Sequence, residues 1–139
     1  MAYDGEGNRV ALVVNGGTPT YYLGSLEEVS GGKLTKYLTS GLSGLPVAER
    51  VGANGTLSYL VSDGLGSMSE VLSSSGTATF QQLFTPYGSL LYSSGTPPTS
   101  FAFTGQRSDS ASGLDYYNAR YYDPVARQFA ISRPASAVW

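Results

Sequence analysis

The sequence predicts an all-β fold, built from a series of antiparallel β-hairpins that form an extended or spiralling sheet. Its 139 residues include 18 glycines and 11 tyrosines but only 13% charged residues, which favours strands joined by tight turns over helices. Glycine paired with asparagine, serine or a second glycine recurs along the chain, and stretches of β-forming residues separate these pairs. The length suits a single domain, 1–139.

The expected strands follow one another along the chain. They lie at residues 10–14, 20–23, 34–38, 47–51, 57–62, 77–84, 90–92 and 100–103. Gly-Thr pairs at 17–18, 55–56, 76–77 and 95–96 have a spacing close to twenty residues, with one pair missing. A two-stranded repeat cannot bury its apolar face alone, so neighbouring hairpins must stack and the end hairpins keep open edges. An exposed loop is expected at 93–99 and coil at 105–112.

A tyrosine-rich stretch near the end of the chain carries the most specific pattern. This stretch comprises FTGQR at 103–107 and GLDYYNARYYDP at 113–124. Three further segments precede it in the chain: YDGEGNRV at 3–10, YLVSDGLGS at 59–67 and TPYG at 85–88. In this order the segments resemble the Rhs, or YD-repeat, family and its C-terminal core region, over nearly the whole chain. The resemblance implies hairpin ribbons wound into filaments or shells, some of which enclose a toxin. It also implies a structural role for the core motif, which comprises Tyr116, Tyr117, Arg120, Tyr121, Tyr122, Asp123 and Pro124.

We therefore divide the chain into hairpin repeats at 1–104, a tyrosine-rich core motif at 105–124 and a docking tail at 125–139. The tail resembles the family least, because Arg133 stands where family members have the aspartate before a proline that supports self-cleavage. A guanidinium cannot act as a carboxylate acid or base. The tail nevertheless looks made for docking and self-assembly. Its expected docking residues are Phe129, Ile131, Arg133, Val138 and Trp139. It can fold back on its own sheet or add to an open edge of another copy, and both alternatives stay open.

Catalysis is not expected, and neither is a cofactor or a metal. The chain has no cysteine and no histidine, which removes the commonest general base and the commonest zinc ligands. Asp115 and Asp123 form a possible carboxylate pair, but pairing with Arg120 or the capping of a turn explains them better. The segments around Asp4 and Asp63 resemble a calcium loop and a phosphate-binding loop, yet each lacks the residues that complete such a site. Both are expected to be turns.

The leading functional hypothesis is a non-catalytic structural protein that assembles end to end through strand pairing into an extracellular filament or tube, with copies of itself as partners. One alternative is a fragment or end-plug of a larger Rhs-type shell that encloses a toxin cargo. A second alternative is a surface that binds carbohydrate through exposed tyrosines such as Tyr22 or Tyr117. Nucleic-acid binding is not expected, because the arginines are scattered. No membrane-spanning stretch and no signal peptide is visible, so an extracellular or cell-surface location rests on the resemblance.

Overall fold

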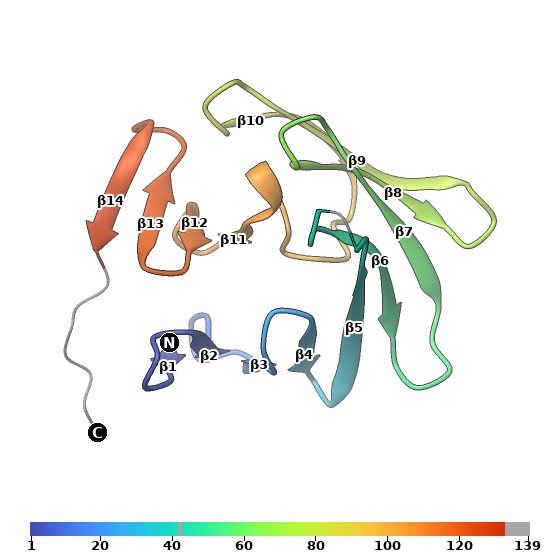
Figure 1. The fold of residues 1–139 in the computed structure, drawn as a ribbon, viewed down its shortest axis with the longest axis horizontal. Coiled ribbons are helices and arrows are strands. Elements are labelled where there is room, and N and C mark those ends of the chain that lie inside the picture. The colour runs from blue at the N-terminus through green and yellow to red at the C-terminus, as the bar shows by residue number, and fades with distance from the viewer. Residues whose placement is uncertain (42, 133–139) are drawn as a thin grey trace.

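Two antiparallel sheets make up the fold in this computed structural model, which describes residues 1–41 and 43–132. The first sheet has ten strands, and each pairs with the next strand along the chain (Figure 1). They are β1 (Ala2–Tyr3), β2 (Arg9–Leu12), β3 (Thr20–Tyr22), β4 (Glu27–Ser30), β5 (Lys33–Thr39), β6 (Pro46–Val51), β7 (Leu57–Ser62), β8 (Met68–Ser73), β9 (Ala78–Phe84) and β10 (Leu90–Gly95). The 3-10 helix η1 (Phe103–Gly105) precedes the four-stranded sheet of β11 (Arg107–Asp109), β12 (Leu114–Tyr117), β13 (Arg120–Asp123) and β14 (Gln128–Ser132). The predicted all-β class of consecutive hairpins is confirmed.

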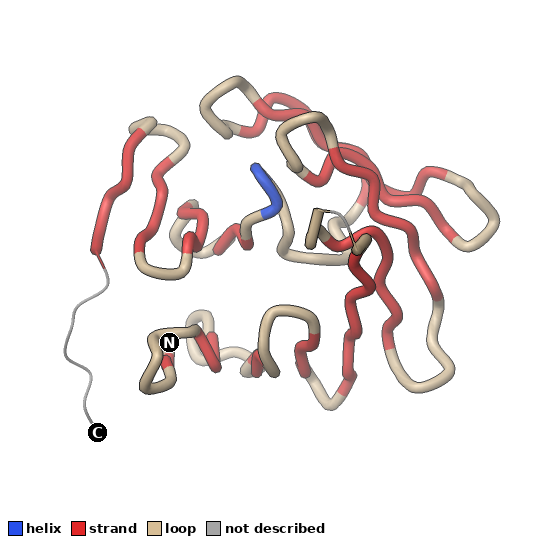
Figure 2. The backbone as a smooth tube through the Cα atoms, in the orientation of Figure 1, coloured by secondary structure: helices blue, strands red, loops and turns tan. Residues whose placement is uncertain are grey.

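The ten-stranded sheet curves around part of the four-stranded sheet. In Figure 1 its strands run from β1 at the lower left, along the bottom and up the right side, to β10 at the top. The helix η1 and the first strands of the second sheet lie inside this curve, as the backbone trace also shows (Figure 2). Residues at the start of the chain therefore face residues beyond position 100. Within the described part of the chain, no helix is long and apolar enough to cross a membrane.

The concave face of the ten-stranded sheet carries the apolar core. Alternate residues of a strand point to opposite faces, so one side chain is buried and the next is exposed. Tyr37 and Leu38, adjacent on β5, are 5% and 49% exposed. The buried cluster consists of Tyr37, Leu60, Met68, Val71 and Phe80. Phe101, from the segment before η1, packs on this cluster with its ring edge-on to Tyr37 at 4.9 Å. The chain that leaves β10 thus returns to cover the core of the sheet.

One turn design recurs at four hairpins. The first residue of each turn uses its side-chain oxygen to accept a hydrogen bond from the backbone N–H four residues later, at 2.7 to 3.1 Å. The fourth residue is a glycine with φ between 83° and 90°, which other residues rarely adopt. The first residues are Asp4, Asp63, Ser73 and Thr85, and the glycines are Gly7, Gly66, Gly76 and Gly88. The two aspartates that resembled ion-binding loops are therefore turn residues, as expected.

Several predicted elements differ from the observed ones. The strand expected at 100–103 is wrong, because only Phe101 forms a single bridge, to Arg107, before η1 begins. The coil expected at 105–112 contains β11. β4 was not expected, since two of its four residues are glutamates. Both glutamates are paired with cations: Glu27 with Lys36 at 3.0 Å and Glu28 with Arg107 at 2.6 Å. The largely buried pair of Glu28 with Arg107 thus offsets the weak strand propensity of β4.

Candidate functional site: the buried polar junction between the sheets

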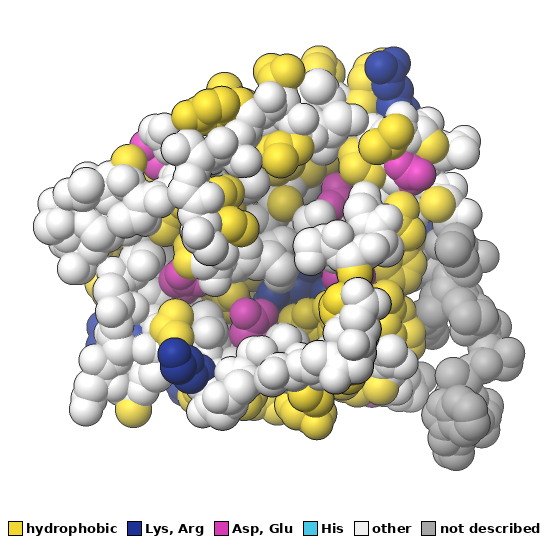
Figure 3. All heavy atoms as spheres, turned by 180° about the vertical axis from the view of Figure 1, so that it is seen from behind, with side chains coloured by type: hydrophobic (Ala, Val, Ile, Leu, Met, Phe, Trp, Pro, Cys, Tyr) yellow, Lys and Arg dark blue, Asp and Glu magenta, His cyan; other side chains and the backbone are white. Residues whose placement is uncertain are grey.

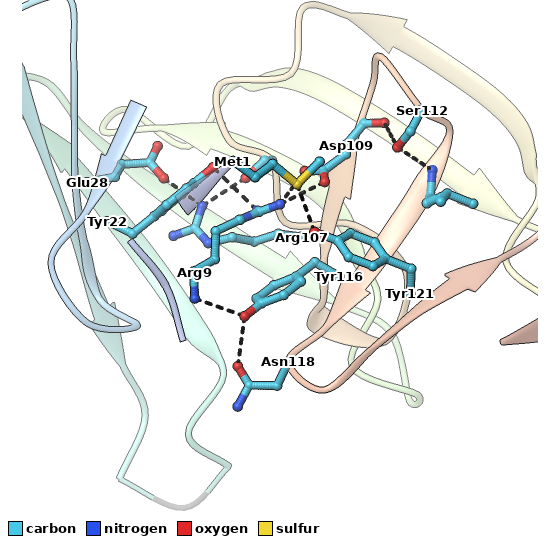
Figure 4. Close-up of polar contacts among 12 residues, drawn as sticks. Met1, Arg9, Tyr22, Glu28, Arg107, Asp109, Ser112, Tyr116, Asn118 and Tyr121 are labelled. Carbon is cyan, nitrogen blue, oxygen red and sulfur yellow. Dashed lines mark hydrogen bonds and ion pairs between the residues drawn. The ribbon is translucent and has the colours of Figure 1, made fainter. Parts of the chain in front are cut away.

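An ion pair between Arg9 on β2 and Asp109 on β11 lies at the centre of the junction (Figure 4). The Arg9 Nη1 donates to both carboxylate oxygens of Asp109 at 2.7 Å. The two side chains are only 1% and 3% exposed. The Arg9 guanidinium also lies over the rings of Tyr22 and Tyr116, at 4.8 and 4.4 Å from their centres. A charge buried to this degree is tolerated because it is paired and surrounded by aromatic rings.

A second arginine, Arg107, joins the same junction from β11. Its Nη1 donates to Glu28 Oε2 at 2.6 Å and to Ser100 Oγ at 2.8 Å. Its guanidinium carbon lies 4.9 Å from the centre of the Tyr22 ring and 4.3 Å from that of Phe101. Tyr22 is therefore in contact with both arginines and only 8% exposed. A carbohydrate-binding role for Tyr22 does not fit this burial, whereas its neighbour Tyr21 is 52% exposed.

Tyrosine hydroxyls complete the junction. The Tyr116 hydroxyl accepts from the backbone N–H of Arg9 at 3.0 Å and donates to Asn118 Oδ1 at 3.2 Å (Figure 4). The hydroxyls of Tyr3 and Tyr121 are hydrogen-bonded to each other at 2.7 Å. Burial raises the pKa of Tyr121, and the hydrogen bond with Tyr3 raises it further, so this phenol stays neutral. The polar contacts thus join β1 and β2 to β12 and β13, across more than 100 positions of the chain.

The structure places the expected core motif on both faces of the four-stranded sheet. Tyr116 and Tyr121 are direct cross-strand partners and are buried at the junction. Tyr117 and Tyr122 lie on the other face, where both rings pack at 5.4 Å against Phe129 of β14.

The remaining motif residues contact strand β14, the β13–β14 turn and the β9–β10 turn. Arg120 lies over the Phe129 ring at 4.0 Å. Asp123 accepts from the backbone N–H groups of Val125 and Ala126 and so caps a turn. The carbonyl of Pro124 accepts from Ser89 Oγ at 2.8 Å, and the Tyr122 hydroxyl donates to the carbonyl of Tyr87 at 2.9 Å. These two bonds reach the β9–β10 turn, at the opposite end of the ten-stranded sheet from Arg9 and Tyr3.

The beginning of the expected docking tail folds back on its own sheet. Phe129 and Ile131 belong to β14, which pairs with β13 in the register Tyr121 to Ile131 and Tyr122 to Phe129. Arg133, Val138 and Trp139 lie outside the described residues. For Gln128–Ser132 the structure therefore shows docking within the chain, and this pairing occupies one edge of the tail strand.

Asp115 and Glu49 are buried carboxylates with raised pKa values, and Asp115 does not form the expected pair with Asp123. Asp115 is cross-strand partner to Tyr122, so Asp123 lies on the opposite face of the sheet. Burial raises the pKa of Asp115 to about 6, against a hydrogen bond from Ser108 that lowers it. Burial, with a smaller effect of Glu28, raises the pKa of Glu49 to about 7. In the described ranges, no three carboxylates lie together as a metal site requires.

A cavity of about 810 Å³ opens between the first hairpins and the core motif. Its walls include both junction arginines, Tyr22, Phe101, Tyr116, Tyr117, Gln106 and Asn118. The two arginines are paired with Asp109 and Glu28, so they offer little net charge.

Sequence reasoning missed the four charged residues of this junction: Arg9, Glu28, Arg107 and Asp109. One signal was available. Arg9 and Arg107 both lie inside family-like segments, and a charge that such a segment buries requires a partner. The sequence alone does not show which acid pairs with which arginine, because the partners lie 100 and 79 positions apart.

No protein-family model matches this chain, and no curated protein matches it. Solved structures do match. This chain is similar to a chain of the Photorhabdus luminescens Tc holotoxin pore, with a TM-score of 0.73 and 21% identity. The match covers 98% of this chain and 8% of that chain. A chain of the TcdB2–TccC3–Cdc42 structure gives a TM-score of 0.71 at 21% identity over the same shares. For TcdB2–TccC3 the TM-score is 0.68 at 18% identity, over 91% of this chain and 7% of that chain.

The chain spans less than a tenth of these much longer chains. At such identities the similarity concerns the path of the backbone and not the activity of the toxin complexes. The curved hairpin sheet, with a tyrosine-rich sheet turned back into it, therefore has the fold of a segment of the TcdB2–TccC3 chains.

Proposed function

We propose that this chain is a non-catalytic structural segment of a larger Rhs-type shell that encloses a toxin, and that it forms an end-plug of that shell. The observation that carries the proposal is the position of the four-stranded sheet. It turns back into the curve of the ten-stranded sheet and bonds to both ends of it, through Arg9 and Asp109 at one end and Tyr122 and Tyr87 at the other. Such an inward-folded sheet closes a curved wall.

Three further observations support this function. The sequence resembles the Rhs core region, and the fold is that of a segment within chains more than ten times longer. The charged and aromatic residues of the junction form buried contacts between the two sheets and do not form an open reactive site. In a longer chain, a preceding hairpin would pair with the edge of β1 on which no described strand pairs, and would continue the sheet. The function implies an extracellular location and a cargo as the partner.

Assembly into a filament is the second candidate. The outer strands β1, β10 and β14 favour it, because each has an edge on which no described strand pairs. The pairing of β14 within the chain disfavours the tail as the linking element, because one edge of that strand is already used.

The test is to express the longest reading frame that contains this chain and to image the product by cryo-electron microscopy. The shell function predicts in-frame hairpin repeats before residue 1 and a hollow particle with this segment at one end. A protease-protection assay on the same particles checks for an enclosed cargo. A reading frame of only 139 residues, whose product forms filaments or stays without a cargo, would contradict the proposal and favour the second candidate.

A further inference from the structure

The last strand of the ten-stranded sheet, β10, has a free edge. It pairs with β9 on one side, and no other described strand pairs with it. All six of its residues are exposed, and the strand lies at the top of the molecule in Figure 1. After an irregularity between Leu90 and Tyr92, its register with β9 is regular up to Gly95. A strand in this position presents backbone N–H and C=O groups that another strand can pair with.

This edge lacks the charges that usually protect an edge strand. From residue 71 to residue 106 the sequence contains no aspartate, glutamate, lysine or arginine. At the chain's average of 13% charged residues, a stretch of this length would carry about five. Soluble proteins commonly place lysine or proline on an exposed edge to block pairing between molecules. Neither residue occurs within β10.

Large apolar side chains flank the same edge. Leu83 and Tyr92 are direct cross-strand partners, and they are 54% and 49% exposed. Leu90 and Leu91 are 57% and 70% exposed. Seen from behind, hydrophobic and uncharged side chains form the left and centre of the upper rim, and a Lys or Arg side chain lies at its right-hand end (Figure 3). An apolar rim beside an unpaired edge marks an interaction surface.

We propose that β10 pairs antiparallel with β10 of a second copy of this chain, so that two ten-stranded sheets join across a two-fold axis. The absence of charge argues for a second copy, because a charged partner would find nothing complementary on this surface. A copy presents the same uncharged edge, and self-pairing then opposes no like charges.

The positions of the nearest charges agree with this pairing. Within the ten-stranded sheet, the charged residue nearest to this edge is Glu70 of β8, two strands away, while Asp123 of β13 lies near the β9–β10 turn, beside Pro124. In the pair, the two copies of β8 are five strand spacings apart, about 24 Å, which exceeds the screening length of about 8 Å. Arg127 lies over the Tyr87 ring at the turn before β10. Antiparallel pairing places the two copies of this turn at opposite ends of the interface.

Pairing of like edges closes on itself, so it gives a dimer and not a filament. A single strand edge with a few apolar side chains is a small interface, so we expect weak association that appears only at high protein concentration. The proposal does not depend on the shell function, since it concerns only surface that the 139-residue chain itself exposes.

Cysteine cross-linking tests the pairing directly, because the chain has no cysteine of its own. The variants Leu91→Cys, Ser93→Cys and Ser94→Cys place one thiol on the edge, and Ser75→Cys in the exposed β8–β9 turn is the matched control. A disulfide requires Cα atoms about 4.4–6.8 Å apart, so the position closest to the two-fold axis should cross-link to its own copy most. Cross-linking at Ser75→Cys equal to that at every edge position, or none at the edge, would overturn the proposal.

Sedimentation equilibrium provides the second measurement. The weight-average mass of the unmodified chain should rise from 14.6 kDa toward twice that value, and no further, as concentration increases. Leu91→Lys should weaken the dimer at least tenfold, since it places like charges in the interface. Leu65→Lys changes a leucine of similar exposure, 67%, in the β7–β8 turn and should leave the dimer unchanged. Equal melting temperatures establish that both variants are folded. A monomer at all concentrations, an open-ended polymer, or a dimer insensitive to Leu91→Lys would contradict the pairing.

Discussion

Gly88 lies against the ring of Phe103, so closely that a Cβ atom at residue 88 would be 2.5 Å from the nearest ring carbon. Gly88 belongs to the β9–β10 turn, whereas Phe103 starts η1 and also packs against Phe84 and Tyr122. This contact seats the 3-10 helix under the last hairpin of the ten-stranded sheet. The glycine is therefore needed for its missing side chain as well as for its φ of 89°.

Gly88→Ala should destabilise the chain much more than Gly76→Ala. Both glycines have positive φ, at 89° and 83°, but nothing lies within 4 Å of a Cβ at Gly76. The backbone strain of about 1 kcal/mol applies to both variants, while overpacking against Phe103 adds about 1–3 kcal/mol for Gly88→Ala alone. Urea unfolding of the two variants measures the difference. Equal losses would mean that Phe103 moves away without penalty.

Asp109→Asn should reduce the free energy of unfolding by about 3 kcal/mol or more, because it leaves the buried Arg9 guanidinium without its counter-charge. The exposed pair of Lys36 and Glu27, joined at 3.0 Å, is the matched control. Glu27→Gln should change the stability by less than about 1 kcal/mol, as exposed ion pairs contribute little. Denaturant unfolding at one pH compares the two variants, and similar losses would refute the assigned importance of burial.

Stability should fall as pH rises through the titration of Glu49. The pKa of this carboxyl is about 7 in the folded chain and 4.5 by reference, so the unfolded chain releases the proton first. Below pH 4.5 both states hold the proton, and above pH 7 the loss reaches its full size of roughly 3 kcal/mol.

Glu49→Gln removes this dependence and should leave the chain more stable than the unmodified protein at pH 8, with little difference at pH 4. Chemical unfolding at several pH values measures the difference between the two proteins. Glu6→Gln, in an exposed turn, is the control and should change neither value. A difference that stays constant from pH 4 to pH 8 would exclude the titration of Glu49 as its cause.

Arg127→Gly should be more stable than Arg127→Ala by about 1 kcal/mol. Arg127 has a φ of 59°, a conformation that carries a penalty for alanine and none for glycine. Both variants lose the contact of the guanidinium with the Tyr87 ring at 5.0 Å, so their difference isolates the backbone effect. Thermal and urea unfolding give the comparison. A more stable alanine variant would contradict the strained assignment at this turn.

The sequence by itself determined the elements whose interactions close within a few residues. The turns after Asp63 and Thr85 were predictable, because the side chain that caps each turn and the glycine that permits it lie within five positions. The alternation along β5, with Tyr37 buried and Leu38 exposed, follows from the period of a strand. Consecutive hairpins need no long-range information, since each strand pairs with its neighbour in the chain.

Only the tertiary structure decided how the two ends of the chain meet. The pairing of Arg9 with Asp109 and of Glu28 with Arg107 depends on partners brought together by the curvature of the sheet. The expected strand at 100–103 was wrong for the same reason: Phe101 packs on the core and Phe103 packs under Gly88, so the chain turns inward there. Local propensity cannot specify these contacts, because their free energy arises from burial between segments distant in the sequence.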